Sequence, residues 1–370
     1  MKEKVYVYIG RFQMAHVGHE AVITHAASKA DRLVLLVGSA ELARDPKNPF
    51  TFEERKSVLE AMAQRIVSEQ WSQGRSVKVD ILPVHDYMYN NTKWLKEVQN
   101  QVLSVTNSQD ITLAGCRKDG DESTFYLDFF PQWKQDFISE VKTSQASIPK
   151  EYREIDAKVN PVPPISSTQL RNQYFSTKQV PAYLPQETTE FLEKFKTRHS
   201  EILDNLVNEH NFVVRYKEQM NKQLPYNNIP FLTGDALVVC AGHVLLVKRR
   251  TYPGKGLWAL PGGFFDAWED QTQVDTALRE LKEETKIQVP FKTLKGSIVK
   301  VDEFGDFERS LRWRLITKCA YIKLDGSVLP KVKGSDDAEK AFWVPLSEIT
   351  KNRHMFFEDH YAIIDTMIGL

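Results

Sequence analysis

His16 and His19 lie three residues apart near the start of the chain, and Gly18 lies between them. The apolar segment Val5–Ile9 before them predicts a strand, and Glu20–Ala30 after them predicts a helix. The first turn of a helix has unpaired N–H groups and a partial positive charge, which favour a bound phosphate. Side chains at i and i+3 face one ligand, and a glycine lets that ligand approach the backbone. We therefore predict a phosphate site at this turn; the alternative is a capped helix start with two surface histidines.

A second segment with side chains suited to phosphate runs from Ile165 to Arg171. Ser166, Ser167 and Thr168 are residue types that cap a helix and offer hydroxyl hydrogen bonds. The arginine would follow on the first turn, where a guanidinium binds phosphate oxygens in a fork. Taken alone, the segment is better explained as a hydroxyl-rich cap with a solvated arginine. Taken with the two histidines, it predicts the second half of one polyphosphate site.

Three carboxylates share one predicted helix face in the second half of the chain. Glu280, Glu283 and Glu284 fall at i, i+3 and i+4, where like charges repel and weaken a helix. A divalent cation such as Mg²⁺, which prefers carboxylate oxygens, would relieve that repulsion. The helix follows Trp258–Gly263, which predicts a strand and a tight glycine turn. The pattern predicts a metal site, and a solvated acidic face of an amphipathic helix is the alternative.

The elements that position the first two segments alternate between strand and helix. Strands are predicted at Val5–Ile9, Leu33–Val37, Val77–Val84 and Ile111–Ala114, and helices at Glu20–Ala30, Thr51–Ser68, Lys93–Ser104 and Phe130–Ser139. This alternation predicts an α/β fold, a doubly wound and mostly parallel sheet. Ligands of such sheets bind at the carboxyl ends of the strands, where the histidines would lie.

The character of the chain changes after residue 185. Apolar residues recur at helical spacing over Gln186–Asn211, which predicts an amphipathic connecting helix or helix pair, and Asn221–Pro230 reads as a loop. Further strands are predicted at Ala236–Val239, Val244–Val247, Gly296–Val301 and Leu311–Ile322, and a last helix at His360–Ile368. We therefore divide the chain into a domain over 1–185, a helical linker over 186–229 and a domain over 230–370.

Length and composition narrow the class of protein. A chain of 370 residues suggests two domains, and 49 basic against 49 acidic residues give no global field for nucleic acid or an anionic membrane. Cys116, Cys240 and Cys319 are widely spaced, as expected for reduced thiols. There is no signal-peptide pattern and no apolar stretch long enough to span a bilayer. We expect a cytoplasmic protein without nucleic-acid or membrane partners. The sequence leaves the oligomeric state open, and a homo-oligomer is one option.

The first half resembles the nucleotidylyltransferases with a His-x-Gly-His motif, most closely the nicotinamide mononucleotide (NMN) adenylyltransferases of the archaeal and bacterial NadM type. The segments that carry the resemblance are Gly10–His19, Arg44–Thr51 with Glu54-Arg55, Tyr89–Asn91 with Trp94, Gly115–Asp119, Tyr126–Trp133 and Ile165–Arg171. One departure is Met14-Ala15, where the family usually has Pro-Phe. The resemblance implies a Rossmann-like domain that transfers AMP from ATP to NMN, giving NAD and pyrophosphate.

The resemblance also implies roles for single residues. His16 and His19 would contact the α-phosphate oxygens, while Arg171 and the start of its helix, Ser166 to Thr168, would hold the β- and γ-phosphates. Mg²⁺ would bridge the phosphates, and Trp94 would stack on the nicotinamide ring. The other expected contacts with ATP or the acceptor are Gly10, Arg11, Phe12, Gln13, Gly18, Arg44, Asn48, Gly115 and Asp119.

Alternatives remain for these assignments. Trp94 fits a core position equally well without the resemblance, and Arg44 and Asn48 fit a polar loop that caps the next helix. The acceptor could be nicotinate mononucleotide or phosphopantetheine rather than NMN. A comparison of acceptors by pyrophosphate release would decide among them.

The second half resembles the Nudix hydrolases, in the form found fused to this type of adenylyltransferase. The segments that carry it are Lys248–Arg250, Gly254–Gly263, Arg279–Glu284, Arg309–Arg312, Asp336–Leu346 and Phe356–Tyr361. The resemblance implies an α/β/α domain that splits ADP-ribose into AMP and ribose 5-phosphate. Mg²⁺ or Mn²⁺ would be held by Glu280, Glu283 and Glu284, the last two also being catalytic, and substrate would be bound by Arg249, Gly263, Arg309 and Arg312.

Three departures from the Nudix pattern bear on this assignment. Nine residues separate Glu269 from Arg279, two more than in the family, so the role of Glu269 stays open. Lys286 stands where a glycine shapes the helix exit, and Trp313 stands where relatives often have glycine. The alternatives are a domain that acts on another nucleoside diphosphate derivative or senses a ligand without turnover. For Arg312, a solvated strand face is also open. The leading interpretation is a bifunctional enzyme that makes and cuts pyrophosphate bridges.

Overall fold

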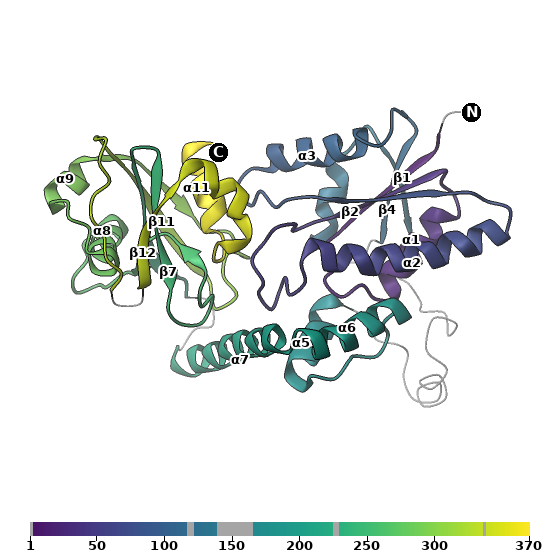
Figure 1. Cartoon of the computed structure of the whole chain (residues 1–370), viewed down its shortest axis with the longest axis horizontal. Coiled ribbons are helices and arrows are strands. Elements are labelled where there is room, and N and C mark those ends of the chain that lie inside the picture. Colours follow the sequence, from purple (N-terminus) through teal and green to yellow (C-terminus); the bar gives the residue numbers. More distant parts are fainter. Residues whose placement is uncertain (1–2, 117–121, 139–165, 225–228, 336–337) are drawn as a thin grey trace. The chain divides into compact units, whose positions relative to one another are not determined.

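A computed structural model describes residues 3–116, 122–138, 166–224, 229–335 and 338–370 of the chain (Figure 1). These residues form two compact units, one from Met1–Tyr87 and Asn91–Val207 and the other from Met88–Asn90 and Asn208–Leu370. The segment 186–229, which we expected to be a separate linker, is therefore divided between the two units. Residue 119, expected to contact nucleotide, lies outside the described residues.

A five-stranded parallel sheet forms the centre of the first unit. Its strands are β1 (Val5–Gly10), β2 (Arg32–Val37), β3 (Lys78–Pro83), β4 (Ile111–Cys116) and β5 (Lys134–Ile138). Their order in the described sheet is β3-β2-β1-β4-β5, so the winding direction changes between β1 and β4. The predicted doubly wound α/β fold is confirmed, and the crevice at the carboxyl ends of β1 and β4 is where such folds bind ligands.

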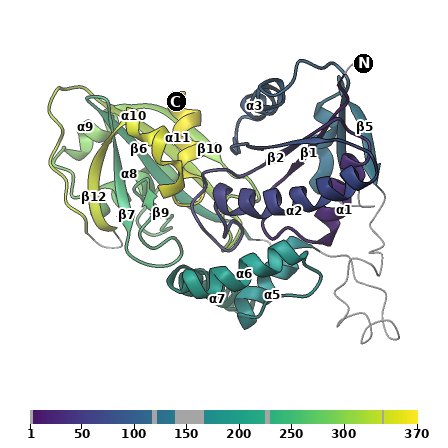
Figure 2. The ribbon, with the colours of Figure 1, turned by 45° about the vertical axis from the view of Figure 1, so that its right-hand side comes forward.

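Helices cover both faces of this sheet (Figures 1 and 2). α1 (Val17–Ala27) and α2 (Phe52–Ser72) pack on one face and α3 (Asn91–Leu103) on the other. Met62 of α2 and Val98 of α3 are fully buried in the two apolar layers. A 3-10 helix (Glu122–Phe129) precedes β5. Helix propensity and the periodic apolar faces explain why these helices match the sequence expectation within a few residues.

The prediction of a helix over 130–139 is wrong, because residues 134–138 form strand β5. Trp133 and Phe137 join the apolar layer on one face of the sheet, whereas Ile138 packs on the other. Asp136 lies on that second face, where Tyr6 donates a hydrogen bond to it at 2.9 Å. This is the alternation of a strand. The polar residues Lys134 to Asp136 hid it, because they favour helix or turn by local propensity.

Three further helices complete the first unit and lead into the second. α5 (Ser167–Thr177), α6 (Gln186–Arg198) and the first turns of α7 (Ser200–Gln223) share one apolar cluster that contains Tyr174 and Phe195. The predicted helix pair after residue 185 is therefore confirmed. From Asn208 onward α7 belongs to the second unit.

The second unit is built on a mixed sheet. Its strands are β6 (Phe231–Cys240), β7 (His243–Arg249), β8 (Trp258–Ala259), β9 (Gly262–Phe264), β10 (Ile298–Phe304), β11 (Leu315–Leu324) and β12 (Ala338–Pro345). The order along its main path is β10-β11-β6-β7-β12; β8 pairs with β7 and β9 with β6. β11 runs parallel to β6, and the other strand pairs of the described sheet are antiparallel.

Helices on both faces make this unit an α/β/α sandwich, as predicted. α8 (Gln273–Thr285) and α9 (Phe291–Gly296) lie on one face, and α11 (His360–Ile368) lies on the other (Figure 1). The short helices α10 (Leu346–Ile349) and a 3-10 helix (Thr350–Met355) precede α11. In the described part of the chain, no helix has the length and apolarity needed to span a bilayer.

Close contact between α8 and β6 fixes the position of the carboxylate helix. A Cβ added to Gly234 of β6 would lie 2.1 Å from the carbonyl oxygen of Gln273 and 2.8 Å from the amide nitrogen of Ala277. Only glycine therefore lets the α8 backbone approach the strand this closely. Ala277, Leu278 and Leu281 of α8 are fully buried on the same side.

Candidate active sites

The two histidines cap helix α1. His16 is the N-cap residue, and its Nδ1 accepts a hydrogen bond from the Gly18 N–H at 3.1 Å. Nδ1 of His19 accepts from the His16 N–H at 3.2 Å, which completes a reciprocal capping box. Because each Nδ1 is an acceptor, a neutral ring carries its proton on Nε2. The ring centroids are 3.9 Å apart, so two Nε2–H donors lie together at the start of the helix.

The glycines of this turn make room for side chains of the turn itself. A Cβ on Gly18 would lie 3.0 Å from Nδ1 and Cε1 of His16, and a Cβ on Gly10 would lie 2.9 Å from Cζ of Phe12. We expected Gly18 to admit a ligand, but its clearest role is to seat the His16 ring. Met14 has a φ of 66°, which a proline, fixed near −65°, cannot adopt. The departure from the family's usual Pro-Phe therefore changes the backbone of this loop.

Buried donors hold the carbonyl groups of the loop in place. Gln13 bonds both the amide and the carbonyl of Phe50 through its side chain, each at 3.0 Å. Arg55 donates to the carbonyls of Arg11, Gly38 and Ser39. Thr188 donates to the Ala15 carbonyl at 2.8 Å. These side chains fix the backbone of the histidine turn. The sequence pointed to Arg55 only as part of a family segment, without this role, and did not point to Thr188.

Arg171 occupies a similar supporting position. It is 4% exposed, and its guanidinium donates to the carbonyls of Gln13 and Pro46 and to Oγ1 of Thr168. Burial, together with the charge of the nearby Arg11, lowers its pKa to about 10. The structure thus uses the fork of Arg171 to join three segments, where we expected it to bind phosphate.

The hydroxyls at the start of α5 also have partners. Ser166 caps the helix by accepting from the Gln169 N–H at 3.2 Å, and Ser167 donates to the Met14 carbonyl at 3.4 Å. The predicted N-cap is confirmed. The segment that we expected to cradle phosphate is thereby connected directly to the histidine loop.

Arg11 is the arginine of this region that faces solvent. It is exposed, and among the described residues no hydrogen bond or ion pair of its guanidinium is found. It lies close enough to Arg55 and Arg171 to lower the pKa of both, after burial as the first cause. Three cations beside two imidazole N–H groups form a positive field at the carboxyl end of β1, which suits a polyphosphate.

The loop before α2 contains two residues that we expected to contact substrate, Arg44 and Asn48, and their surroundings differ. Arg44 binds Glu54 with both Nη groups, at 2.7 and 2.8 Å, and donates to the Pro49 carbonyl. It therefore fastens the loop to α2, as the polar-loop alternative expects. Asn48 is 7% exposed, and its buried Oδ1 has no hydrogen-bond partner among the residues that the structure describes. A buried acceptor without a donor suits a bound ligand that supplies one.

Trp94 lies half-buried at the edge of an aromatic cluster. Its ring is 5.9 Å from those of Tyr126 and Phe130, and the Tyr126 ring is edge-on to it. This position is compatible with both the core and the stacking interpretation. Gly115, which we also expected to contact nucleotide, packs against the ring of Phe137. A Cβ on Gly115 would lie 3.3 Å from that ring, so the glycine allows this close packing.

The carboxylate helix of the second unit begins and ends as its sequence suggests. Thr272 and Asp275 form a capping box at its start. Lys286 ends it with a φ of 45°, the left-handed conformation that a glycine adopts without strain. Lys286, which stands where the Nudix family has a glycine, therefore affects the end of the helix, as expected.

Arg279 connects the carboxylates of α8. Its Nη1 donates to Glu280 at 2.9 Å and to Glu283 at 3.0 Å. Asp270 binds the other side of the guanidinium, accepting from Nε at 3.0 Å and from Nη2 at 2.9 Å. The side chain of Asp270 is 2% exposed, whereas Glu269 is 66% exposed and 3.9 Å from Arg279. Asp270 is thus the residue that anchors the longer loop. The sequence left the role of Glu269 open and did not point to Asp270.

Glu284 faces the turn that contains β9. It is 8% exposed, and its Oε2 accepts from the Gly262 N–H at 3.0 Å. Burial, with a contribution from the charge of Glu280, raises its pKa to about 8. Gly263 lies against Glu280, because a Cβ there would be 2.3 Å from Oε1 of that carboxylate. Two acidic groups therefore converge on the same glycine turn, with Arg279 bound to Glu280 and Arg249 within electrostatic reach of Glu284.

This donor set fits a divalent cation by its chemistry. Carboxylate oxygens are the preferred ligands of Mg²⁺ and Mn²⁺, and a cation would relieve the repulsion that Glu284 and Glu280 exert on each other. Among the residues with a described structure, however, no three His, Cys, Asp or Glu side chains are grouped closely enough to hold a metal ion. Arg279 holds Glu280 and Glu283 instead.

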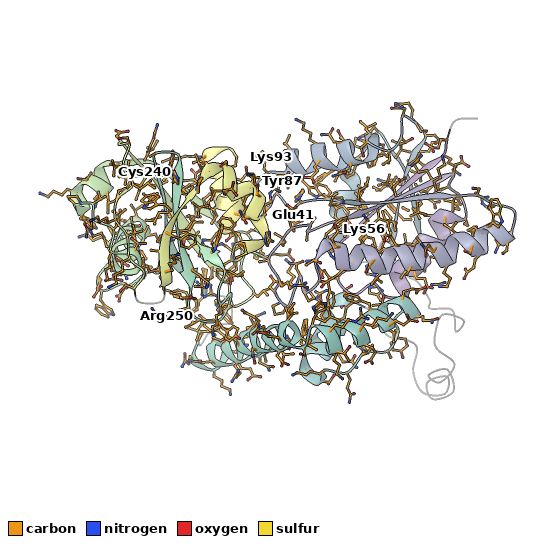
Figure 3. All side chains as sticks on the ribbon, in the orientation of Figure 1. Glu41, Lys56, Tyr87, Lys93, Cys240 and Arg250 are labelled. Atoms are coloured by element: carbon orange, nitrogen blue, oxygen red, sulfur yellow. The ribbon has the colours of Figure 1, made fainter. Side chains whose placement is uncertain are left out.

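Two arginines stack on one aromatic ring beside this helix. The Cζ of Arg249 is 4.1 Å and that of Arg312 is 5.6 Å from the centroid of Phe357. Arg249 lies within electrostatic reach of Glu284, so cations and carboxylates meet at one place. Arg250, the next residue, is exposed and donates to the Ala338 carbonyl instead (Figure 3). Two guanidinium groups therefore share one aromatic ring, and one of them lies near the Glu284 carboxylate.

Arg309 is placed differently from its expected role. It forms a buried, two-bond ion pair with Asp359, in which the two side chains are 3% and 0% exposed. Asp359 also accepts a hydrogen bond from Tyr89 at 2.5 Å. The fork of Arg309 is therefore occupied, and the arginine supports the site from inside the core.

Comparisons with known proteins agree with the family resemblance of each half of the chain. A family model described as cytidylyltransferase-like matches residues 7–173, and the NUDIX domain model matches residues 231–367. The nicotinamide/nicotinic acid mononucleotide adenylyltransferase of Acinetobacter baylyi is 28% identical over 191 residues, which are 51% of this chain and 85% of that protein.

Solved structures match over nearly the whole chain. A bifunctional NMN adenylyltransferase/ADP ribose pyrophosphatase from Francisella tularensis is 30% identical, with a TM-score of 0.82 over 99% of this chain and 98% of that chain. A second structure of such a bifunctional enzyme from Francisella tularensis, complexed with AMP and a manganese ion, is 29% identical. Its TM-score is 0.81, over 99% of this chain and 98% of that chain.

Proposed function

Because the chain belongs to the family of bifunctional NMN adenylyltransferases/ADP-ribose pyrophosphatases, we propose that it carries out both reactions. The first unit transfers AMP from ATP to NMN, giving NAD and pyrophosphate. The second hydrolyses ADP-ribose to AMP and ribose 5-phosphate. The observation that carries this proposal is the similarity over both units together, which no single motif provides.

In the first reaction, the 5′-phosphate of the mononucleotide attacks the α-phosphorus of ATP and pyrophosphate leaves. Catalysis then rests on position and on stabilisation of charge on the phosphoryl oxygens. We assign that stabilisation to the Nε2–H groups of His16 and His19 and to Arg11. The capping hydrogen bonds of both histidines support the assignment, because they orient each Nε2–H before substrate binds. Asn48 offers its unpaired Oδ1 to a donor of the bound nucleotide.

In the second reaction, water attacks one phosphorus of the diphosphate and the other phosphate leaves with its sugar. Glu280, Glu283 and Glu284 would hold Mg²⁺ or Mn²⁺, which supplies charge neutralisation and activates water when bound. Arg249 and Arg312 bind the diphosphate oxygens, and Arg279 with Asp270 positions the carboxylates. We further propose that the enzyme acts in the cytoplasm on small nucleotides, without nucleic-acid or membrane partners.

A product assay on the whole chain tests the proposal. With ATP, NMN and Mg²⁺ we expect NAD and pyrophosphate, and with ADP-ribose and Mg²⁺ we expect AMP and ribose 5-phosphate. Nicotinate mononucleotide in place of NMN measures acceptor preference. Absence of NAD formation would overturn the first assignment. Binding of ADP-ribose without release of AMP would instead support a sensing role for the second unit.

A further inference from the structure

Helix α7 contacts the part of the second unit that holds the stacked arginines. The helix lies outside residues 231–367, which the hydrolase family model matches, yet from Asn208 onward it belongs to the second unit. Glu209 accepts a hydrogen bond from the Gly254 N–H through its Oε1 at 2.6 Å. The loop that contains Gly254 joins β7 to β8.

That loop lies between Glu209 and Phe357. Gly254 has a φ of 73°, and a Cβ on it would lie 2.2 Å from Cδ2 of Phe357. The Pro253 carbonyl accepts from Nε of Arg249 at 2.9 Å. A charged acceptor on one side and an aromatic ring on the other therefore fix the loop, and the loop fixes Arg249.

The orientation of Arg249 leaves part of its guanidinium available. Nε is engaged by Pro253, and the plane stacks on Phe357 at 4.1 Å. Within the described ranges, no hydrogen bond or ion pair of its Nη1 or Nη2 is found. A guanidinium held by Nε and one face presents its two Nη groups in a fork, which is the geometry for phosphate oxygens.

We propose that Glu209 of the connecting helix is a positioning residue for the hydrolase site, which holds the 253–254 loop so that Arg249 binds the diphosphate of the substrate. This inference rests on the proposed function of the second unit. It extends the hydrolase site to an element that precedes the family domain in the sequence. Glu209 contacts no substrate atom in this scheme and acts through Gly254 and Pro253.

Variants of the full-length chain test this proposal. Glu209→Ala removes the acceptor, whereas Glu209→Gln keeps an oxygen that accepts the Gly254 N–H. Glu218→Ala is the matched control, because Glu218 is exposed on the same helix and alanine favours a helix at both positions. We expect Glu209→Ala to raise the KM for ADP-ribose about tenfold with kcat within about twofold of the parent chain. Glu209→Gln should restore most of the affinity, and Glu218→Ala should change neither constant.

Binding without turnover gives a second measurement. Titration with AMP in the absence of a divalent cation should show the same order of affinities, with Glu209→Ala weakest. A KM for Glu209→Ala equal to that of Glu218→Ala would overturn the proposal, and so would a Gln variant as weak as the Ala variant. Adenylyl transfer by each variant confirms that the chain is folded. A parent chain that releases no AMP from ADP-ribose overturns the proposed hydrolysis instead, and the AMP titration then still reports the role of Glu209.

Discussion

The two histidines that first indicate a phosphate site cap helix α1 in a geometry that also suits their proposed role in adenylyl transfer. Their spacing of three residues is the spacing of a capping box, in which the N-cap and N3 side chains bond each other's backbone. The same hydrogen bonds occupy Nδ1 of both rings and so place the protons on Nε2. A capped helix start and a phosphate site were competing interpretations of His16 and His19. In the structure, the cap orients the groups that a phosphate would use.

Replacing His16 separates these two functions. Asparagine is among the best N-cap residues, so we expect His16→Asn to keep the stability of the parent chain within about 0.5 kcal/mol. His16→Ala should lower the free energy of unfolding by about 1 kcal/mol, because the Gly18 N–H loses its acceptor. Both variants should lose adenylyl transfer by about 100-fold or more, as removal of one charge-stabilising donor does elsewhere. An asparagine variant with full activity would show that the ring acts only as a cap.

Asp136 provides a test of electrostatics in the first unit. Burial alone would raise its pKa, but hydrogen bonds from Lys29, His25 and Tyr6 outweigh burial and hold the pKa at about 2. A pKa lowered in the folded state stabilises the fold above the unfolded value of 3.8. That contribution, about 2 kcal/mol, should be lost as the pH falls from about 4 to about 2.

The measurement is urea unfolding of the parent chain and of Asp136→Asn between pH 2 and pH 7. The variant should be less stable at pH 7, and its loss of stability below pH 4 should be smaller than that of the parent. Equal slopes in the two chains below pH 4 would contradict the lowered pKa.

At the scale of elements, the sequence predicts what local periodicity encodes. The first four strands, the helix pair after residue 185 and α11 follow apolar patterns and were expected near their observed positions. β5 was mistaken for a helix because its first three residues are polar, and only its pairing with β4 makes it a strand. Contacts between distant segments have no local pattern.

In the candidate sites, too, the sequence predicts local features and does not predict contacts between distant segments. The histidine pair and the carboxylate helix could be read from spacing, but the partners of Arg171 and Arg309 could not. Both arginines bind groups far away in the sequence, the Gln13 carbonyl and the Asp359 carboxylate. A sequence motif indicates which residues lie near a site. Whether an arginine guanidinium faces the ligand or binds other protein groups depends on its burial in the folded chain.

The contact of α8 with β6 predicts a sharp requirement for glycine. Gly234→Ala would place a Cβ 2.1 Å from the Gln273 carbonyl, so α8 must move away from the strand. We expect the unfolding free energy of the second unit to fall by about 2 to 4 kcal/mol, with loss of ADP-ribose hydrolysis. Gly296→Ala is the control, because no atom of the described residues lies within 4 Å of its added Cβ. Thermal unfolding compares the two, and equal midpoints would contradict the close approach.

At the scale of the whole molecule, each unit has its own sheet, apolar core and candidate site. The chain carries equal numbers of basic and acidic residues, so attraction of anionic substrates depends on local groups rather than on net charge. Arg11 with the histidine pair serves one unit, and Arg249 with Arg312 serves the other. The described ranges thus contain two arrangements of cationic groups, one for each proposed site, built from unrelated elements.

Two sites built from separate cores should be separable by single substitutions. His16→Asn should abolish adenylyl transfer and leave the kcat and KM for ADP-ribose within about twofold of the parent chain, because no side chain of the second site changes. Glu284→Gln should abolish hydrolysis, since it removes a charged ligand for the cation, and leave NAD synthesis unchanged. Parallel assays of both products on the same preparations measure this. Loss of both activities in either variant, with the thermal midpoint of the parent retained, would show that the two reactions depend on one another.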